Sequence, residues 1–171
     1  VQYEGSQLVA VADSVYENAK NLAKTYGVNP TSVDEIFKDN SIESILIASS
    51  TDTHSDFIEK ASKAGKAILC EKPVDLSLAR AKRCLENAKS NENSVMMGFN
   101  RRFDPNFVAL KNALDRGEIG KAELLSITSF DPAPPSIDYV KVSGGIFKDM
   151  MIHDFDMANF LYGESVSYTH L

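Results

Sequence analysis

Short apolar runs alternate with amphipathic stretches over roughly the first hundred residues of the chain. The runs are continuous rather than alternating, which is typical of strands covered on both faces of a parallel sheet. Between them, apolar residues recur every three or four positions, which indicates amphipathic helices. The predicted strands are Leu8–Ala12, Glu43–Ser49, Ala67–Glu71 and Ser94–Phe99, and the predicted helices are Ser14–Tyr26, Asp34–Asp39, Thr53–Ala64 and Ser77–Ser90.

This alternation predicts an α/β fold with a doubly wound parallel sheet built from right-handed βαβ units. In such sheets, ligands bind at the carboxyl ends of the strands. Each predicted strand ends in polar residues, which we expect to open on the same crevice. These polar ends are Asp13, the stretch from Ser49 to His54, Glu71-Lys72-Pro73, and Asn100-Arg101-Arg102.

The pattern changes after Arg102, where we place a domain boundary that separates residues 1–102 from residues 103–171. The second part begins with a predicted helix, Pro105–Arg116. Ala122–Phe130 alternates between apolar and polar residues, as expected of a strand with one solvated face. Asp131–Ser143 is rich in Pro and Ser and is interpreted as a loop. A final helix is predicted from Gly145 to Gly163.

The helix predicted from Gly145 to Gly163 carries Asp149, His153 and Asp156 along one line, although its other sides are apolar. We expect it to be packed nearly all round, with this line facing a partner or a cavity. Asp149 and His153 are spaced i, i+4, so a carboxylate could fix the imidazole tautomer and leave the other nitrogen as a base. A solvated polar stripe is the simpler alternative. A metal site is disfavoured, because Asp154 projects roughly 100° away from His153.

Composition and charge exclude several classes of function. The hydrophobic content of 43% and charged content of 25% are those of a soluble globular protein. The net charge of −6 disfavours binding to nucleic acid or to an anionic membrane. No apolar run approaches the roughly 20 residues needed to cross a bilayer. Cys70 and Cys84 fit no metal motif and are interpreted as free thiols in a reducing compartment, the cytoplasm.

Two strand ends carry candidate cofactor ligands. Asp13 could accept hydrogen bonds from the ribose hydroxyls of a dinucleotide, or it could simply cap the following helix. The glycine-rich turn that precedes such an acid in dinucleotide-binding units is absent from this chain. His54 could contact a cofactor phosphate or ribose, or it could be a capping or surface histidine.

Lys72 stands at a third strand end, where its ammonium could donate to a substrate oxygen that gains negative charge. Pro73 restricts Lys72 to extended geometry. A surface ion pair in a loop is the alternative. Arg101 and Arg102 could bind polyol oxygens, although we expect one of the two to be structural.

These stretches together resemble the glucose–fructose oxidoreductase and inositol dehydrogenase family, from about Leu8 to Glu164. The resemblance is carried by VAVAD, ILIASSTDTH, CEKPVDLS, GFNRRFDP and GGIFKDMMIHDFDM. Glu-Lys-Pro followed downstream by Asp-x-x-x-His is a specific combination for this family. The resemblance implies an N-terminal Rossmann domain that binds NAD and a C-terminal α/β domain with an open sheet.

The resemblance also implies roles for individual residues in NAD-dependent oxidation of a cyclic polyol, myo-inositol to 2-keto-inositol, by an enzyme that is a homo-oligomer when intact. It places Lys72, Asp149 and His153 on the catalytic triad. It places Asp13 on the adenosine ribose. The remaining assignments are Ser49, Ser50, His54, Glu71 and Lys72 near the cofactor, and Asn100 and Arg101 in the substrate pocket.

The chain departs from the family pattern at both ends. The first strand and the glycine-rich turn are missing, the C-terminal domain stops early, and the tail from Ser165 looks foreign. We therefore expect an internal fragment of a protein about twice as long, inactive by itself. Two alternatives remain: a dehydrogenase for another sugar or polyol, and a nonenzymatic dinucleotide-responsive regulator. The presence of Lys72, Asp149 and His153 together argues against the regulator, which needs none of them.

Overall fold

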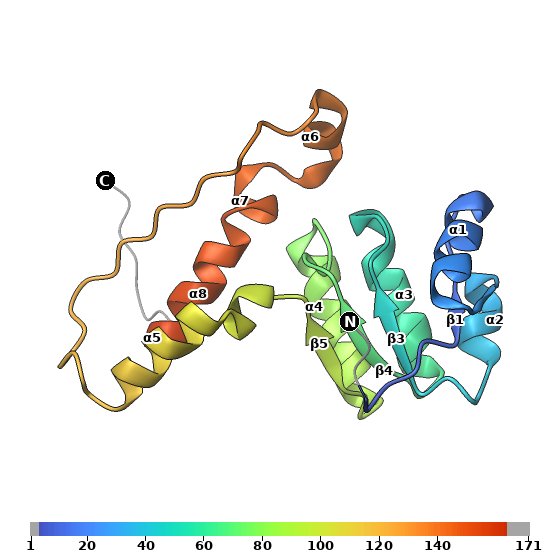
Figure 1. Ribbon diagram of the computed structural model, residues 1–171, viewed down its shortest axis with the longest axis horizontal. Helices are drawn as coiled ribbons and strands as arrows, with labels where there is room; N and C mark the ends of the chain where they lie inside the picture. Colours follow the sequence, from blue (N-terminus) through green and yellow to red (C-terminus); the bar gives the residue numbers. More distant parts are fainter. Residues whose placement is uncertain (1–3, 164–171) are drawn as a thin grey trace. The chain divides into compact units, whose positions relative to one another are not determined.

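Figure 1 shows the computed structural model, which describes residues 4–163. The contacts divide the chain into two compact units, Val1–Met96 and Met97–Leu171. The predicted domain boundary near Arg102 stays a prediction; in the structure, residues 100–103 pack against helices of the second unit. The tail 165–171, which the sequence pattern sets apart, lies outside the described residues.

The first unit alternates strands and helices, as the sequence predicts. Its elements are β1 (Ala10–Val11), α1 (Tyr16–Tyr26), β2 (Asn29–Pro30), α2 (Val33–Lys38), β3 (Ser44–Ile47), α3 (Thr51–Lys63), β4 (Ala67–Cys70), α4 (Leu78–Ser90) and β5 (Val95–Met97). Helix α1 ends at Gly27, whose φ of 67° lies in the left-handed region that glycine adopts without steric cost. Helix α2 begins with a capping box in which Ser32 and Glu35 each accept a backbone N–H of the other.

The strands of the first unit pair in parallel and form two sheets. One sheet contains β1 and β2, and the other has the order β3-β4-β5. Ile47 lies opposite Cys70, so the carboxyl ends of β3 and β4 are neighbours. The predicted parallel α/β architecture is confirmed.

The second sheet is buried on only one face, which corrects the prediction of strands covered on both faces. Side chains of a strand point alternately to opposite faces. Those on the face toward α3 and α4 are buried, including Ile47 and Ile68. On the other face, Leu46, Leu69 and Met96 are 67%, 39% and 47% exposed. The apolar runs thus mark strands whose second face is not covered by any of residues 4–163.

The two cysteines lie inside the first unit as free thiols. Cys70 ends β4, and the Cys84 thiol donates to the Ser55 carbonyl across 3.4 Å. Burial raises the pKa of the Cys70 thiol to about 12 and that of the Cys84 thiol to about 11. Both groups are therefore packing residues rather than nucleophiles near neutral pH.

The second unit is helical over the described residues. Its elements are the 3₁₀ helix η1 (Asn100–Phe103), α5 (Pro105–Asp115), α6 (Ile137–Ser143), α7 (Ile146–Asp149) and α8 (Ile152–Tyr162). Helix α5 begins with Pro at its first position, and the Asp104 carboxylate caps it by accepting the Asn106 N–H at 2.8 Å.

Two predictions for the segment between α5 and α7 were wrong. Ala122–Phe130 is extended but is not assigned as a strand, because no described segment hydrogen-bonds along it as a ladder. A strand needs a paired neighbour, and alternation alone does not provide one. The predicted loop Asp131–Ser143 contains α6, whose first turn is capped by the Ser136 hydroxyl accepting the Tyr139 N–H at 3.2 Å.

The single helix predicted from Gly145 to Gly163 is broken into α7 and α8, so that prediction was also wrong. At the break, the Met151 N–H donates to the Ile146 carbonyl five residues back, and the His153 N–H donates to the Met150 carbonyl three residues back. The i→i−4 ladder is thus interrupted between Asp149 and Ile152. The expected packing on all sides is not found either. Met157 and Leu161 are buried, whereas Phe155 is half exposed.

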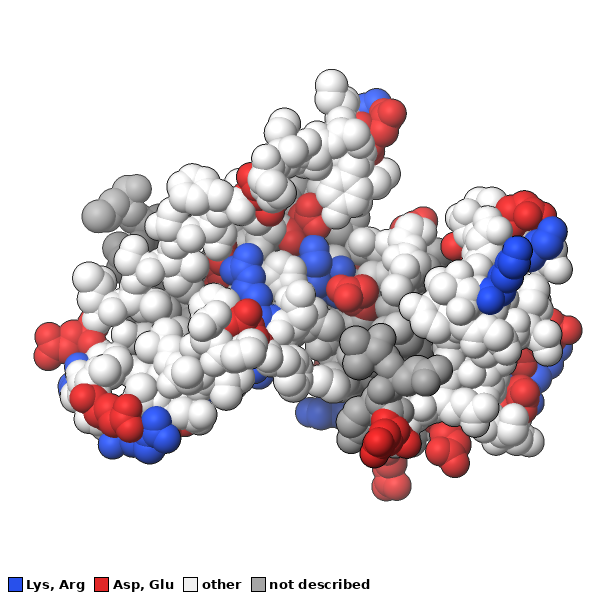
Figure 2. All heavy atoms as spheres, viewed as in Figure 1, with Lys and Arg blue, Asp and Glu red and all other residues white. Residues whose placement is uncertain are grey.

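The surface of the described residues carries mixed charge. Lys and Arg side chains do not gather into an extended patch on the face shown in Figure 2. Among residues 4–163, no helix has the length and apolar character needed to span a membrane.

Candidate active site

The carboxyl ends of β3 and β4 bring two candidate segments to one edge of the sheet in the first unit. Ser49 and Ser50 follow β3, and Glu71 and Lys72 follow β4. The Glu71 N–H donates to the Ile47 carbonyl at 2.9 Å, so the pairing continues one residue beyond β4. Ligands of parallel α/β sheets bind at this edge.

Lys72 is half-buried at this edge, and its peptide bond to Pro73 is cis. The Lys72 backbone N–H donates to a carboxylate oxygen of Glu71 at 3.3 Å. Glu71 itself is exposed. An ammonium in this position can stabilise negative charge that develops on a bound oxygen.

His54 is buried in the first unit, with 1% of its surface exposed. Its Nδ1 lies 2.7 Å from the Pro73 carbonyl oxygen, and its Nε2 lies 3.0 Å from the Ser49 carbonyl oxygen. The ring therefore connects the segments that follow β3 and β4. The predicted contact between His54 and a cofactor would require one of these contacts to be given up.

Ser49 and Ser50 are exposed next to the first turn of α3. The Ser49 and Thr53 hydroxyls share a hydrogen bond of 2.6 Å, and the Thr53 hydroxyl lies 2.7 Å from the Ser50 carbonyl. These bonds fix the segment at the positive end of the α3 dipole. Exposed hydroxyls beside a helix N-terminus suit the phosphate and ribose groups of a dinucleotide.

Asp13 follows β1 and is exposed. Its Oδ1 accepts the Val15 N–H at 2.7 Å and lies 3.5 Å from the Asn18 amide nitrogen. The carboxylate thus holds the turn that leads into α1, but it does not cap the helix: the N-cap residue is Val15, and no side chain makes a capping hydrogen bond there. Its contacts with described residues all use Oδ1, so Oδ2 can still accept ribose hydroxyls.

Asp149 ends α7 in the second unit and accepts a hydrogen bond from the Tyr139 hydroxyl at 2.7 Å. This hydrogen bond to the carboxylate raises the pKa of Tyr139. Sequence reasoning missed Tyr139, because it lies in the segment interpreted as a loop. Ser136 three residues before Tyr139 was the available signal, since Ser is a favoured N-cap.

His153 lies in the first turn of α8 and is half-buried. Its ring meets the Phe99 ring edge to face, with 6.4 Å between centroids and 88° between planes. This ring contact restrains the orientation of the imidazole without using either of its ring nitrogens as a hydrogen-bonding group. A hydrogen bond donated by the His153 imidazole to the Asp149 carboxylate stays a prediction; the two residues lie on either side of the break between α7 and α8.

Arg101 pairs with Asp154 in the second unit. Its Nη1 lies 2.5 Å from Asp154 Oδ1, and the Ser129 hydroxyl donates to the same oxygen at 2.7 Å. These bonds give Asp154, for which the sequence suggested no role, a structural one on the flank of α8. A guanidinium has five N–H donors, so a substrate contact by Arg101 stays a prediction.

Arg102 pairs with Asp156, one residue further along η1 and two residues further along α8. Three N–H···O contacts of 2.6, 2.8 and 3.0 Å join them, and these bonds raise the pKa of Arg102. The guanidinium also lies 5.5 Å from the centre of the Phe160 ring. The two consecutive arginines therefore bind α8 through Asp154 and Asp156, the residues directly before and after Phe155 in the sequence. Asn100, the remaining predicted substrate residue, is exposed at the start of η1.

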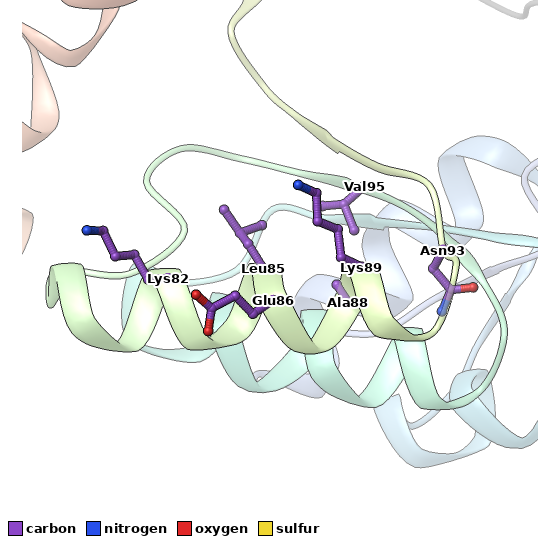
Figure 3. A pocket seen from close by; sticks show the side chains of 7 residues that line it. All are labelled: Lys82, Leu85, Glu86, Ala88, Lys89, Asn93 and Val95. Carbon is purple, nitrogen blue, oxygen red and sulfur yellow. The ribbon is translucent and has the colours of Figure 1, made fainter.

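The described residues 4–163 form no metal cluster that would compete with these residues as a site. No group of three or more His, Cys, Asp or Glu could hold a metal ion there. A hollow of about 660 Å³ lies along α4 in the first unit (Figure 3). It contains none of the predicted site residues; its lining is Lys82, Leu85, Glu86, Ala88, Lys89, Asn93 and Val95.

Two family models match the chain. Residues 2–99 match an oxidoreductase family with an NAD-binding Rossmann fold, and residues 107–170 match the GFO/IDH/MocA C-terminal domain. The second match extends through residue 170 and covers most of the tail. That result contradicts the interpretation of the tail as foreign.

Curated relatives match nearly the whole chain. Inositol 2-dehydrogenase of Rhizobium meliloti (strain 1021) is 50% identical over 159 residues, which are 93% of this chain and 48% of the relative. Myo-inositol 2-dehydrogenase of Thermotoga maritima is 45% identical over 161 residues, with the same two shares, 93% and 48%. The chain therefore spans about half the length of these curated relatives.

A solved structure shows the same architecture. The crystal structure of a myo-inositol dehydrogenase from Corynebacterium glutamicum ATCC 13032 matches with a TM-score of 0.86 and 46% identity. The match covers 91% of this chain and 47% of that chain.

Proposed function

Because the chain belongs to the Gfo/Idh/MocA oxidoreductase family, we propose that the full-length protein is an NAD-dependent inositol 2-dehydrogenase. It oxidises a ring hydroxyl of myo-inositol to the ketone. The observation that carries this proposal is the 50% identity to an inositol 2-dehydrogenase over 93% of the chain. The chain also contains Lys72, Asp149 and His153, the three residues that the chemistry needs.

The first unit supplies groups that fit the cofactor. Asp13 accepts the ribose hydroxyls, and its charge disfavours the 2′-phosphate of NADP. The hydroxyls of Ser49 and Ser50 and the carboxylate of Glu71 lie at strand ends of the same unit. NAD, when bound, supplies the acceptor for the hydride that leaves the substrate carbon.

The second unit supplies the groups that handle the proton. His153 takes the proton of the ring hydroxyl as that oxygen forms its double bond to carbon. The Asp149 carboxylate orients His153 and stabilises the imidazolium. Tyr139 holds Asp149 by donating to it at 2.7 Å, so the carboxylate is restrained from a second side. Lys72, which belongs to the first unit, stabilises the alkoxide that develops on the substrate oxygen during the same step.

A dehydrogenase assay on the full-length protein tests the proposal. Wild type and His153→Ala are compared with NAD and a panel of inositol isomers and sugars. We expect His153→Ala to lose about a hundredfold to ten-thousandfold in kcat, the usual contribution of a general base. Asn159→Ala, at an exposed position on the same helix, is the control and should retain wild-type kcat.

Each alternative has its own outcome in this assay. Activity of His153→Ala equal to wild type would refute the assignment of His153 as the base. A higher kcat/KM for a sugar than for any inositol would change the substrate but keep the reaction. NAD binding without product from any compound would favour a dinucleotide-responsive regulator.

Location and assembly belong to the same proposal. We expect a cytoplasmic protein that forms a homo-oligomer when full-length, on the basis of the family resemblance. Size-exclusion chromatography with light scattering measures the assembly, and a monomer would contradict it.

A further inference from the structure

We propose that His54 is a positioning residue for Lys72. Its imidazole ties the Pro73 carbonyl, which directly follows Lys72, to the Ser49 carbonyl beyond the end of β3. This inference rests on the proposed function for the role of Lys72, whereas the tie itself is a property of the first unit.

The contacts of His54 span two segments that are distant in sequence. His54 lies in the first turn of α3, five residues after Ser49 and nineteen before Pro73. Its two ring nitrogens lie 2.7 Å and 3.0 Å from the carbonyl oxygens of those residues. His54 is 1% exposed and Pro73 is buried, so water does not compete for the Pro73 carbonyl. One rigid side chain thus sets the spacing between the two strand ends.

The backbone at these positions needs the donor that His54 supplies. Beyond a strand, a buried carbonyl has lost its ladder partner, and leaving it unpaired costs free energy. Carbonyls only accept hydrogen bonds, so a neutral imidazole donates to one of the two, and an imidazolium donates to both. In either protonation state, removing the ring takes a hydrogen-bond donor away from this pair of carbonyls, of which the Pro73 carbonyl lies in the buried contact.

The next residue of α3 makes a second tie, which provides a matched control. Ser55 is 2% exposed, and its hydroxyl donates to an Asp75 carboxylate oxygen at 2.7 Å. Asp75 in turn accepts the Ser77 N–H at 2.8 Å. Both ties fasten the turn after β4 to α3, but only the His54 tie is adjacent to Lys72. Loss of the Ser55 tie should therefore affect stability without moving the lysine.

A small displacement of Lys72 is enough to affect catalysis. Misplacing a catalytic group by about 1 Å can reduce the rate about a hundredfold. His54 does not need to contact the substrate or the cofactor to have this effect. It acts through the backbone of Pro73, and so kcat should change more than KM for the polyol.

Two amide variants of the full-length protein separate the two contacts of His54. The amide nitrogen of His54→Asn replaces Nδ1 and keeps the bond to Pro73, whereas that of His54→Gln replaces Nε2 and keeps the bond to Ser49. We expect His54→Gln to lose about tenfold to a hundredfold in kcat. His54→Asn and the control Ser55→Ala should stay within about threefold of wild type, since Lys72 keeps its anchor. Thermal unfolding is measured for all three.

A second measurement is independent of enzyme activity. Crystal structures of wild type and His54→Gln give the position of the Lys72 backbone, which should shift in the variant and stay in place in Ser55→Ala. An unchanged Lys72 in His54→Gln overturns the inference, even if no substrate is found. A folded His54→Asn that loses kcat as strongly as His54→Gln also overturns it. If the wild-type protein is inactive but Lys72 is shifted in His54→Gln, the result contradicts the proposed function and leaves this inference intact.

Discussion

The ion pair between Arg102 and Asp156 should be energetically asymmetric. The Asp156 side chain is 7% exposed, whereas the Arg102 side chain is 41% exposed. Removing Arg102 leaves a buried carboxylate without its cation. Removing Asp156 leaves a guanidinium that water can reach. We therefore predict that Arg102→Ala destabilises the second unit more than Asp156→Ala does.

The structure sets the size of this difference. Leaving a buried charge unpaired costs about 3 kcal/mol or more in the free energy of unfolding. Losing hydrogen bonds to a charged group that can rehydrate costs about 1.5 kcal/mol. Arg102→Ala also loses the contact with the Phe160 ring, which is worth about 0.5–1 kcal/mol. Arg102→Ala should therefore cost about 2 kcal/mol more than Asp156→Ala.

Urea unfolding monitored by far-UV circular dichroism measures both variants, since the chain contains no Trp. Lys141→Ala is the control, because its pair with Asp138 is exposed, at 67% and 92%, and should contribute well under about 1 kcal/mol. Equal costs for Arg102→Ala and Asp156→Ala, or a larger cost for Asp156→Ala, would refute the argument from burial.

Three further predictions concern the first unit. Hydrogen bonds from Thr31 and Ser32 lower the pKa of Glu35 from 4.5 to about 2, so its stabilising effect should be present above pH 4.5 and lost as the pH falls toward 2; an NMR titration midpoint near 4.5 would contradict this. Burial raises the pKa of the Cys70 thiol from 9.0 to about 12, so the stability that the buried neutral thiol contributes should be lost as the pH rises from 9.0 to about 12. The folded protein should also resist alkylation by iodoacetamide at pH 8, and fast alkylation would contradict the burial of this thiol. Ile58 is fully buried, so Ile58→Ala should cost about 2–5 kcal/mol and Ile58→Val about 0.5–1.5 kcal/mol in urea unfolding; similar costs for both would contradict a close-packed site.

Local sequence signals located most elements of the first unit. Strands β3 and β4 and helices α1, α3 and α4 lie where apolar periodicity predicts them, because each pattern reflects a face that packs against a neighbour. The two-residue strand β2 was missed, since two residues carry no period. In the second unit, Ala122–Phe130 shows the limit of alternation, which describes a strand only where another segment supplies its hydrogen bonds.

The candidate site was predictable as residue types at strand and helix ends, but its internal contacts were not. Glu-Lys-Pro and Asp-x-x-x-His single out Lys72, Asp149 and His153 as candidates, from spacing and family resemblance, and their catalytic roles stay predictions. Nothing in the sequence pairs Tyr139 with Asp149, or Arg101 with Asp154, because each pair joins different elements. The burial of His54 between two carbonyls was equally invisible, since a histidine after a strand end also suits a surface or a ligand.

By itself, the sequence determined the βαβ order, the polar strand ends and the residues available for chemistry, because these follow from nearest neighbours along the chain. The tertiary structure decided which polar groups meet. It interrupted the helix between Asp149 and Ile152, paired both arginines of η1 with acids of α8, and enclosed His54 beside the turn that follows Lys72. The physical reason is that a buried polar group must find a partner, and the partner is chosen by how the elements pack rather than by distance along the sequence.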